Sequence, residues 1–143
     1  MPKILFIGDV VGKGGRRILR QALPKWQEQY RPDATIVNVE NLAHGKGVTL
    51  STLAELAALD IDCFTGGNHI FNKDADQCFD RYAKLIRPAN FAGSLPGHGY
   101  YRFAKGGRQY LVINLIGQVF MEHQFEGEIG SPFAAIGPLL AQE

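Results

Sequence analysis

The sequence predicts an α/β domain in which a parallel sheet with crossover helices is followed by an antiparallel hairpin. Short apolar runs without clean alternation, which suit buried strands, alternate with stretches of helical periodicity between residues 3 and 85. This order is typical of successive βαβ units. Two β-rich runs joined by AKGGRQ then occupy residues 99–117, and the two glycines at the junction indicate a hairpin.

The expected strands are the three apolar runs KILFIGD, ATIVNVE and DCFTGG. The first run is bounded by Gly8 and Asp9, and it suits a strand that is buried on both faces. The expected helices have apolar residues at helical spacing and cover residues 15–30, 49–59 and 73–85. Pro24 should kink the first of these helices or start another one, and Thr49 or Ser51 should cap the second.

The last residues, 122–143, form a weakly patterned tail in which Gly137 and Pro138 are expected to interrupt a helix over residues 133–140. The sequence contains no internal repeat, no low-complexity segment and no obvious linker. We therefore expect residues 1–143 to form a single domain, as their number also indicates.

Composition excludes several classes of protein. The apolar share of 45% and the charged share of 20% are ordinary for a globular protein, and a formal charge of +1 gives no signal for nucleic acid or an anionic membrane. No apolar run is long enough to span a bilayer, and the first residues lack the features of a signal peptide. The two cysteines, Cys63 and Cys78, form no CxxC pair, which favours a reducing, cytoplasmic location.

Polar side chains follow all three expected strands. Asp9 ends the first run, Glu40 and Asn41 end the second, and Asn68 and His69 follow the third within TGGNHIFNK. Because the carboxyl ends of parallel strands meet at one edge of a sheet, where ligands bind, these side chains are expected to converge. Glycines near each group allow the backbone to pass close to a bound ion or phosphate.

Two carboxylates with two amides and an imidazole suit a divalent metal such as Mn²⁺, Fe²⁺ or Zn²⁺, or a pair of metals. A pair needs a bridging carboxylate at a metal–metal distance of ~3.5–4 Å, and it can hold both oxygens of a phosphoryl displacement. On this interpretation Asn68 contacts metal, while His69 faces the substrate and protonates the leaving oxygen.

Other interpretations of the same residues remain open. An Asp after a strand is commonly a helix cap or a turn former. The stretch GDVVGKGG could be a loose phosphate loop of a dinucleotide-binding oxidoreductase, although it lacks GxGxxG spacing. Arg87 in RPAN could bind a phosphate or pair with a carboxylate. His44 in the glycine-rich loop, His98 in LPGHGY and His123 in the tail are weaker ligand candidates.

Five blocks together resemble the YmdB-like family, a branch of the calcineurin-like metallophosphoesterases. The blocks run in the family's order from Lys3 to about Met121, and they are LFIGDVVGKGGR, NVENLAHGKGVT, GGNHIFNK, RPANF and INLIGQVFME. The resemblance implies the calcineurin-like fold and the hydrolysis of small phosphodiesters, including 2′,3′-cyclic nucleotides, with two iron or manganese ions. It also implies that Asp9, Glu40, Asn41 and Asn68 are metal ligands with Glu40 as the bridge, and that His69 is the proton donor.

Three departures from the family pattern qualify these expectations. Val39 stands where the family usually has a glycine, and Phe71 and Asn72 stand where it usually has tryptophan and aspartate. Family members are also nearly twice as long, and their second half supplies DFHAE-like and GTHTH-like motifs with three histidine ligands, neither of which occurs here.

The expected domain is therefore a truncated metallophosphoesterase fold that lacks the C-terminal half. Alone it is expected to bind metal weakly or to hold a single ion, and to be a homo-oligomer or to associate with a separate C-terminal half. The alternative is a catalytically impaired remnant or binding module of the same family.

Overall fold

The computed structural model describes residues 1–121 and 127–141. Its main feature is a four-stranded parallel sheet with the strand order β1-β2-β3-β4. The strands are β1 (Ile4–Ile7), β2 (Ala34–Asn38), β3 (Cys63–Thr65) and β4 (Leu85–Ile86). The connecting helices are α1 (Gly12–Tyr30), α2 (Leu50–Ala57) and α3 (Ala75–Arg81). This arrangement confirms the predicted α/β class and its parallel sheet.

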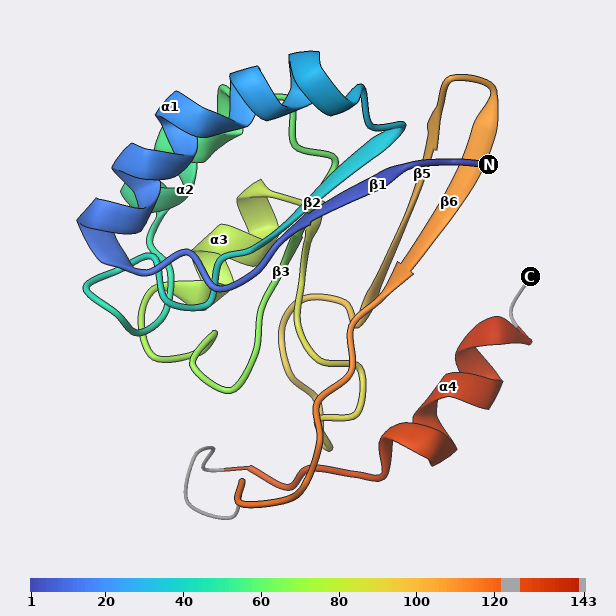
Figure 1. Cartoon of the computed structure of the whole chain (residues 1–143). Coiled ribbons are helices and arrows are strands. Elements are labelled where there is room, and N and C mark those ends of the chain that lie inside the picture. The colour runs from blue at the N-terminus through green and yellow to red at the C-terminus, as the bar shows by residue number, and fades with distance from the viewer. Residues whose placement is uncertain (122–126, 142–143) are drawn as a thin grey trace.

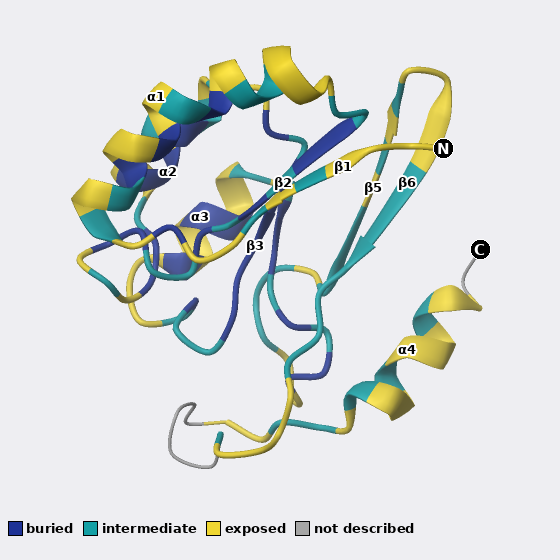
Figure 2. Ribbon diagram, viewed as in Figure 1, coloured by how far each residue is buried: buried dark blue, intermediate teal, exposed yellow. Residues whose placement is uncertain are grey.

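The three connecting helices lie on the same side of the sheet (Figure 1). Because each crossover adds the next strand in the same direction, right-handed connections place all three helices on one face. The hydrophobic core fills the space between them and the sheet, and Val37, Phe64 and Leu85 contribute to it from three successive strands. Figure 2 shows that the buried segments gather there.

The predicted hairpin is also confirmed. β5 (Tyr100–Lys105) and β6 (Arg108–Ile113) form a separate two-stranded antiparallel sheet. The chain reverses at Gly106 and Gly107, whose φ angles are +59° and +74°. Two consecutive residues with positive φ form the hairpin turn that matches the twist of paired strands, which explains the glycine pair in AKGGRQ.

The hairpin is tied to the parallel sheet by polar contacts at both ends. Lys105 pairs with Asp60 and Asp62, just before β3, with Nζ–Oδ2 distances of 3.3 and 2.9 Å. Beyond β6, Asn114 Nδ2 donates to the Gly66 carbonyl at 2.9 Å, at the carboxyl end of β3. The second contact supports the start of the loop that carries Asn68 and His69.

Strand β1 differs from the prediction, because it is not buried on both faces. Leu5 and Ile7 pack against the core, whereas Ile4 and Phe6 are 49% and 57% exposed on the opposite face. β1 is an edge strand of the described sheet and pairs only with β2 there. An apolar run gives the same pattern in an edge strand and in a central strand, so the sequence did not distinguish the two positions.

Helices α1, α2 and α4 (Pro132–Leu140) give three further findings. α1 runs without interruption through Pro24, so no second helix starts there, and Thr49 is the residue that caps α2.

Helix α4 forms although Gly137 and Pro138 were expected to interrupt it. None of its residues is buried, so water can satisfy the carbonyl that Pro138 leaves without a donor (Figure 2). No helix in the described parts of the chain combines the length and apolarity needed to cross a membrane.

Candidate functional site

The predicted site residues lie at the carboxyl edge of the parallel sheet, each just after a strand. Asp9 follows β1, Glu40 and Asn41 follow β2, and Asn68 and His69 follow β3. The backbone ladder continues past the strand ends, since the Val39 amide donates to the Thr65 carbonyl at 2.9 Å. Hydrogen bonds link all three segments, so the structure brings the five predicted residues together.

The first contact joins the segments after β1 and β2. Asn41 Nδ2 donates to Asp9 Oδ1 at 2.7 Å, while the backbone carbonyl of Asn41 accepts from the Gly12 amide at 2.9 Å. The other polar side-chain atom of Asn41, Oδ1, is buried and has no hydrogen-bond partner. A buried acceptor without a donor is costly and calls for an explanation, and a cation bound beside Asp9 would supply one.

The second contact joins the segments after β2 and β3. Glu40 Oε2 accepts from the backbone amide of His69 at 3.2 Å. Burial raises the pKa of Glu40; the amide of His69 opposes this shift, and the negative charge of Asp9 adds to it. The charge of His69 also lowers the pKa, but burial outweighs it, and a cation bound at the carboxylate would lower the pKa further.

The ring of His69 lies between two amide side chains. Its Nδ1 is 3.2 Å from Asn72 Oδ1, and its Nε2 is 3.3 Å from Asn68 Nδ2. Because an amide oxygen only accepts, this contact is a hydrogen bond in the tautomer whose Nδ1 carries the proton, while Asn68 Nδ2 lies within 3.4 Å of both ring nitrogens. Asn72 thus orients the imidazole from the position at which the family pattern usually has aspartate.

These donors suit one hard divalent cation. The carboxylates of Asp9 and Glu40 and the unpartnered oxygen of Asn41 are oxygen ligands of the kind that Mg²⁺ and Mn²⁺ accept. Within residues 1–121 and 127–141, no three His, Cys, Asp or Glu side chains form a group that could hold a metal. A site here therefore depends on the amide oxygens of Asn41 and Asn68 as well as on the carboxylates.

The weaker candidates lie apart from these contacts. His44 and His98 are exposed, and His44 has the left-handed φ of 58° within the glycine-rich loop. His123 lies outside the described residues. Arg87 donates from Nε to the Pro96 carbonyl at 3.2 Å and from Nη1 to the Pro88 carbonyl at 2.9 Å, so its contacts are with backbone, not with a carboxylate.

One residue that matters for the site's geometry, Arg16, was missed from the sequence, whereas Gly66 and Gly67 were expected to clear space at the site. Gly67 approaches Glu40 so closely that any side chain there would overlap the carboxylate. Arg16 is buried and hydrogen-bonded to the carbonyl of Leu42, next to Asn41. Its position three and seven residues before Leu19 and Leu23, both buried in α1, was a signal that it lies on the apolar face of the helix.

Comparison with known proteins agrees with this fold. A family model described as YmdB-like protein matches residues 5–143. A Bacillus subtilis (strain 168) protein named 2′,3′-cyclic-nucleotide 2′-phosphodiesterase is 38% identical over 141 residues, which are 98% of this chain and 52% of that protein. The chain spans about half the length of the curated relatives it matches.

Two solved structures superpose on almost the whole chain. A hypothetical protein from Thermus thermophilus gives a TM-score of 0.87 at 31% identity, covering 99% of this chain and 53% of that one. A novel phosphatase from Mycoplasma pneumoniae also gives a TM-score of 0.87, at 29% identity, covering 99% and 51%. With the family match extending over nearly all of its residues, the chain belongs to the YmdB-like protein family.

Proposed function

We propose that this chain carries the first half of a metal-dependent phosphodiesterase site that acts on small phosphodiesters such as cyclic nucleotides. The observation that supports it best is the unpartnered oxygen of Asn41, whose side chain contacts Asp9. The preceding residue, Glu40, is a carboxylate with a raised pKa. Both features favour a cation at this edge of the sheet. The name of the Bacillus subtilis relative supports the substrate class.

In this proposal Asp9, Glu40, Asn41 and Asn68 would hold the metal, which would be iron or manganese, and Glu40 would be the ligand shared with a second ion. The bound metal supplies Lewis-acid stabilisation of the phosphoryl oxygens and an activated water. His69 gives a proton to the leaving oxygen. Asn72 holds the imidazole through Nδ1, which directs Nε2 away from that contact. The proposed compartment is the cytoplasm, in keeping with two free, buried cysteines.

The direct test is hydrolysis of bis-para-nitrophenyl phosphate with added Mn²⁺, comparing the chain with Asp9→Ala, Glu40→Ala and His69→Ala and measuring the metal content of each. We expect both carboxylate variants to lose metal. Equal metal content in the wild type and in these two variants would refute the metal site.

A second candidate is a non-catalytic module of the same family that binds a nucleotide or a protein partner without turnover. It needs neither the DFHAE-like nor the GTHTH-like motif, which do not occur in residues 1–143. Nucleotide binding at equilibrium without phosphodiester hydrolysis, in the presence of Mn²⁺, would support it. A reading frame downstream that encodes both motifs would instead favour an enzyme assembled from two parts.

A further inference from the structure

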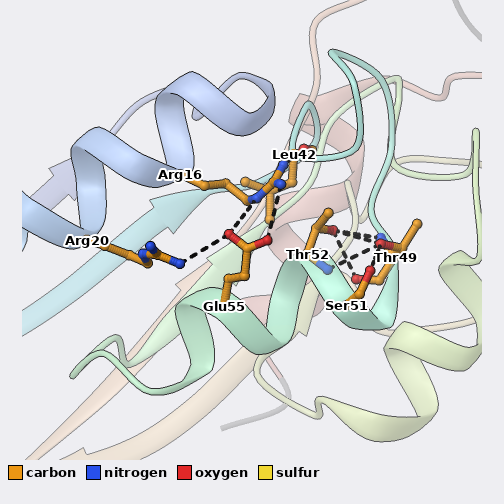
Figure 3. Close-up of polar contacts among 7 residues, drawn as sticks. All are labelled: Arg16, Arg20, Leu42, Thr49, Ser51, Thr52 and Glu55. Atoms are coloured by element: carbon orange, nitrogen blue, oxygen red, sulfur yellow. Dashed lines mark hydrogen bonds and ion pairs between the residues drawn. The ribbon is translucent and has the colours of Figure 1, made fainter.

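Arg16 in α1 connects two parts of the molecule that are distant in sequence (Figure 3). Its Nε and Nη2 donate to the two carboxylate oxygens of Glu55 in α2, at 3.0 and 3.2 Å. Its Nη1 donates to the backbone carbonyl of Leu42, in the segment that follows β2. The guanidinium is thus held by a carboxylate on one side and presents its remaining nitrogen to the loop on the other.

Because Arg16 is buried, its hydrogen-bond donors have to be satisfied by protein atoms. The residue is 9% exposed, and a buried guanidinium is tolerated only where its donors are satisfied. The fork of an arginine can engage Glu55 with two nitrogens and Leu42 with a third at the same time, whereas a lysine has one nitrogen at the end of a flexible stem. The geometry therefore requires this residue type, not merely a positive charge.

The contact with Leu42 restrains the position of the candidate metal ligands, because Leu42 directly follows Glu40 and Asn41 in the chain. The Asn41 carbonyl accepts from Gly12 at the start of α1, and the Leu42 carbonyl accepts from Arg16 one turn later. Two consecutive carbonyls of the segment are therefore held by α1. This attachment limits how far the Glu40 and Asn41 side chains can shift at the sheet edge.

We propose that Arg16 is a positioning residue, which fixes the segment after β2 so that Glu40 and Asn41 present their oxygens to a divalent cation. This inference rests on the proposed function for its metal, but the positioning itself is a property of the chain. A purely structural role, in which Arg16 only joins α1 to α2 through Glu55, is the competing interpretation. It predicts a loss of stability without a change in the segment.

Arg20 provides a matched control. It lies four residues further along α1, is half exposed, and its Nη1 is 3.5 Å from the same oxygen of Glu55 that accepts from Arg16 Nε. In Figure 3 its side chain reaches Glu55 only, and it makes no contact with the Leu42 carbonyl. Arg20→Met therefore removes an arginine from the same ion-pair group while leaving the segment attached.

The experiment measures two properties of the wild type, Arg16→Met, Arg16→Lys and Arg20→Met. Amide hydrogen exchange of Leu42 and Ala43 is recorded without metal, with Phe64 in β3 as the internal reference. Mn²⁺ affinity is measured by calorimetry under conditions in which each variant is folded. We expect Arg16→Met to speed exchange at Leu42 and Ala43 but not at Phe64, and to weaken Mn²⁺ binding about tenfold or more. Arg20→Met should leave both properties unchanged.

The conservative variant keeps the test decisive if Arg16→Met does not fold. Arg16→Lys should fold and still show faster exchange at Leu42, because one ammonium cannot replace the three donors. Wild-type exchange and Mn²⁺ affinity in Arg16→Lys would overturn the inference, as would a lower melting temperature alone in Arg16→Met. Failure of the wild type to bind Mn²⁺ would refute the proposed metal site, while the exchange data would still decide the role of Arg16.

Discussion

Gly67 lies against the carboxylate of Glu40, so that a Cβ built on Gly67 would overlap both carboxylate oxygens and their carbon. The close approach places the segment after β3 beside the segment after β2, where the His69 amide donates to Glu40. A side chain at Gly67 would therefore displace the carboxylate at the flexible end of Glu40, and the glycine in GGNH keeps this space free.

Gly67→Ala should displace Glu40 and lower both Mn²⁺ affinity and phosphodiesterase activity, by about tenfold or more for affinity if Glu40 is a ligand. Calorimetric titration with Mn²⁺ measures this directly. Gly8→Ala is the control, because a Cβ on Gly8, next to Asp9, meets no atom within 4 Å. Equal Mn²⁺ affinity in the two variants would show that the position of Glu40 does not matter for metal.

The role of His69 can be separated from that of the metal ligands. If the chain or a reconstituted form is active, His69→Ala should lower turnover more than metal content, since a proton donor acts in the transition state. Turnover of bis-para-nitrophenyl phosphate and metal content are measured on the same samples. Loss of metal at unchanged turnover per metal would identify His69 as a ligand.

The convergence of Asp9, Glu40 and His69 could be predicted because topology alone determines it. Three apolar runs separated by helical stretches imply parallel strands, and parallel strands place their carboxyl ends at one edge. The hairpin was equally accessible, since Gly106 and Gly107 mark the turn in the sequence. In both cases a local sequence pattern is compatible with essentially one arrangement: parallel strands for the alternating runs, and a tight turn for the glycine pair.

Features that depend on contacts with residues distant in sequence could not be predicted from the sequence. Strand β4 has two residues, Leu85–Ile86, which is too short to show any periodicity. The exposure of Phe6 depends on what covers the sheet, not on its own run of residues. Gly67 and Arg16 act through contacts with Glu40 and Leu42, and no spacing in the sequence reveals those distances.

The ion pair of Arg16 and Glu55 should make stability depend on pH. The side-chain hydrogen bond from Arg16 lowers the pKa of Glu55 below its ordinary value of 4.5, although partial burial opposes the shift. A lowered pKa contributes stability above the unfolded value, and this contribution is lost as the pH falls through the folded value. Glu55→Gln should therefore lower the melting temperature at pH 7, by an amount that narrows below pH 4.5.

Thermal melts of the wild type and Glu55→Gln between pH 7 and the lowest pH at which both remain folded would measure this difference. Glu28→Gln, an exposed carboxylate on α1, serves as the control for a general charge effect. A difference between wild type and Glu55→Gln that stays constant below pH 4.5 would mean that ionisation of Glu55 is not its source.

The exposed apolar side chains of the edge strand β1 should cause self-association. Ile4 and Phe6 of the edge strand β1 are about half exposed, whereas their register partners in β2, Ala34 and Ile36, are buried and half-buried. Helix α4 adds Phe133, which is 89% exposed. Adjacent exposed apolar side chains on an edge strand favour association with another chain. Sedimentation velocity should show oligomers or aggregates that decrease in Ile4→Ser/Phe6→Ser.

The control for that result is Ile18→Ser, which removes an equally exposed apolar side chain from α1, on the other side of the sheet. It should leave the oligomeric state unchanged. If both variants reduce association equally, general surface hydrophobicity is the cause, and the sheet face has no special role.

The oxygen ligands at the sheet edge should hold metal weakly in the isolated chain. Asp9 and Glu40 are the two carboxylates of the predicted ligand set. Their negative charge compensates one divalent cation but not two, so a second ion that shares the bridging carboxylate should dissociate before the first. We expect a single weak Mn²⁺ site by calorimetry and little or no phosphodiesterase activity.

Adding a separately expressed polypeptide with the DFHAE-like and GTHTH-like motifs should restore metal binding and turnover together, and should cover the sheet face so that self-association falls. A monomeric chain with two tightly held metals and full activity would refute this, and would mean that His44, His98 or His123 supplies the missing ligands.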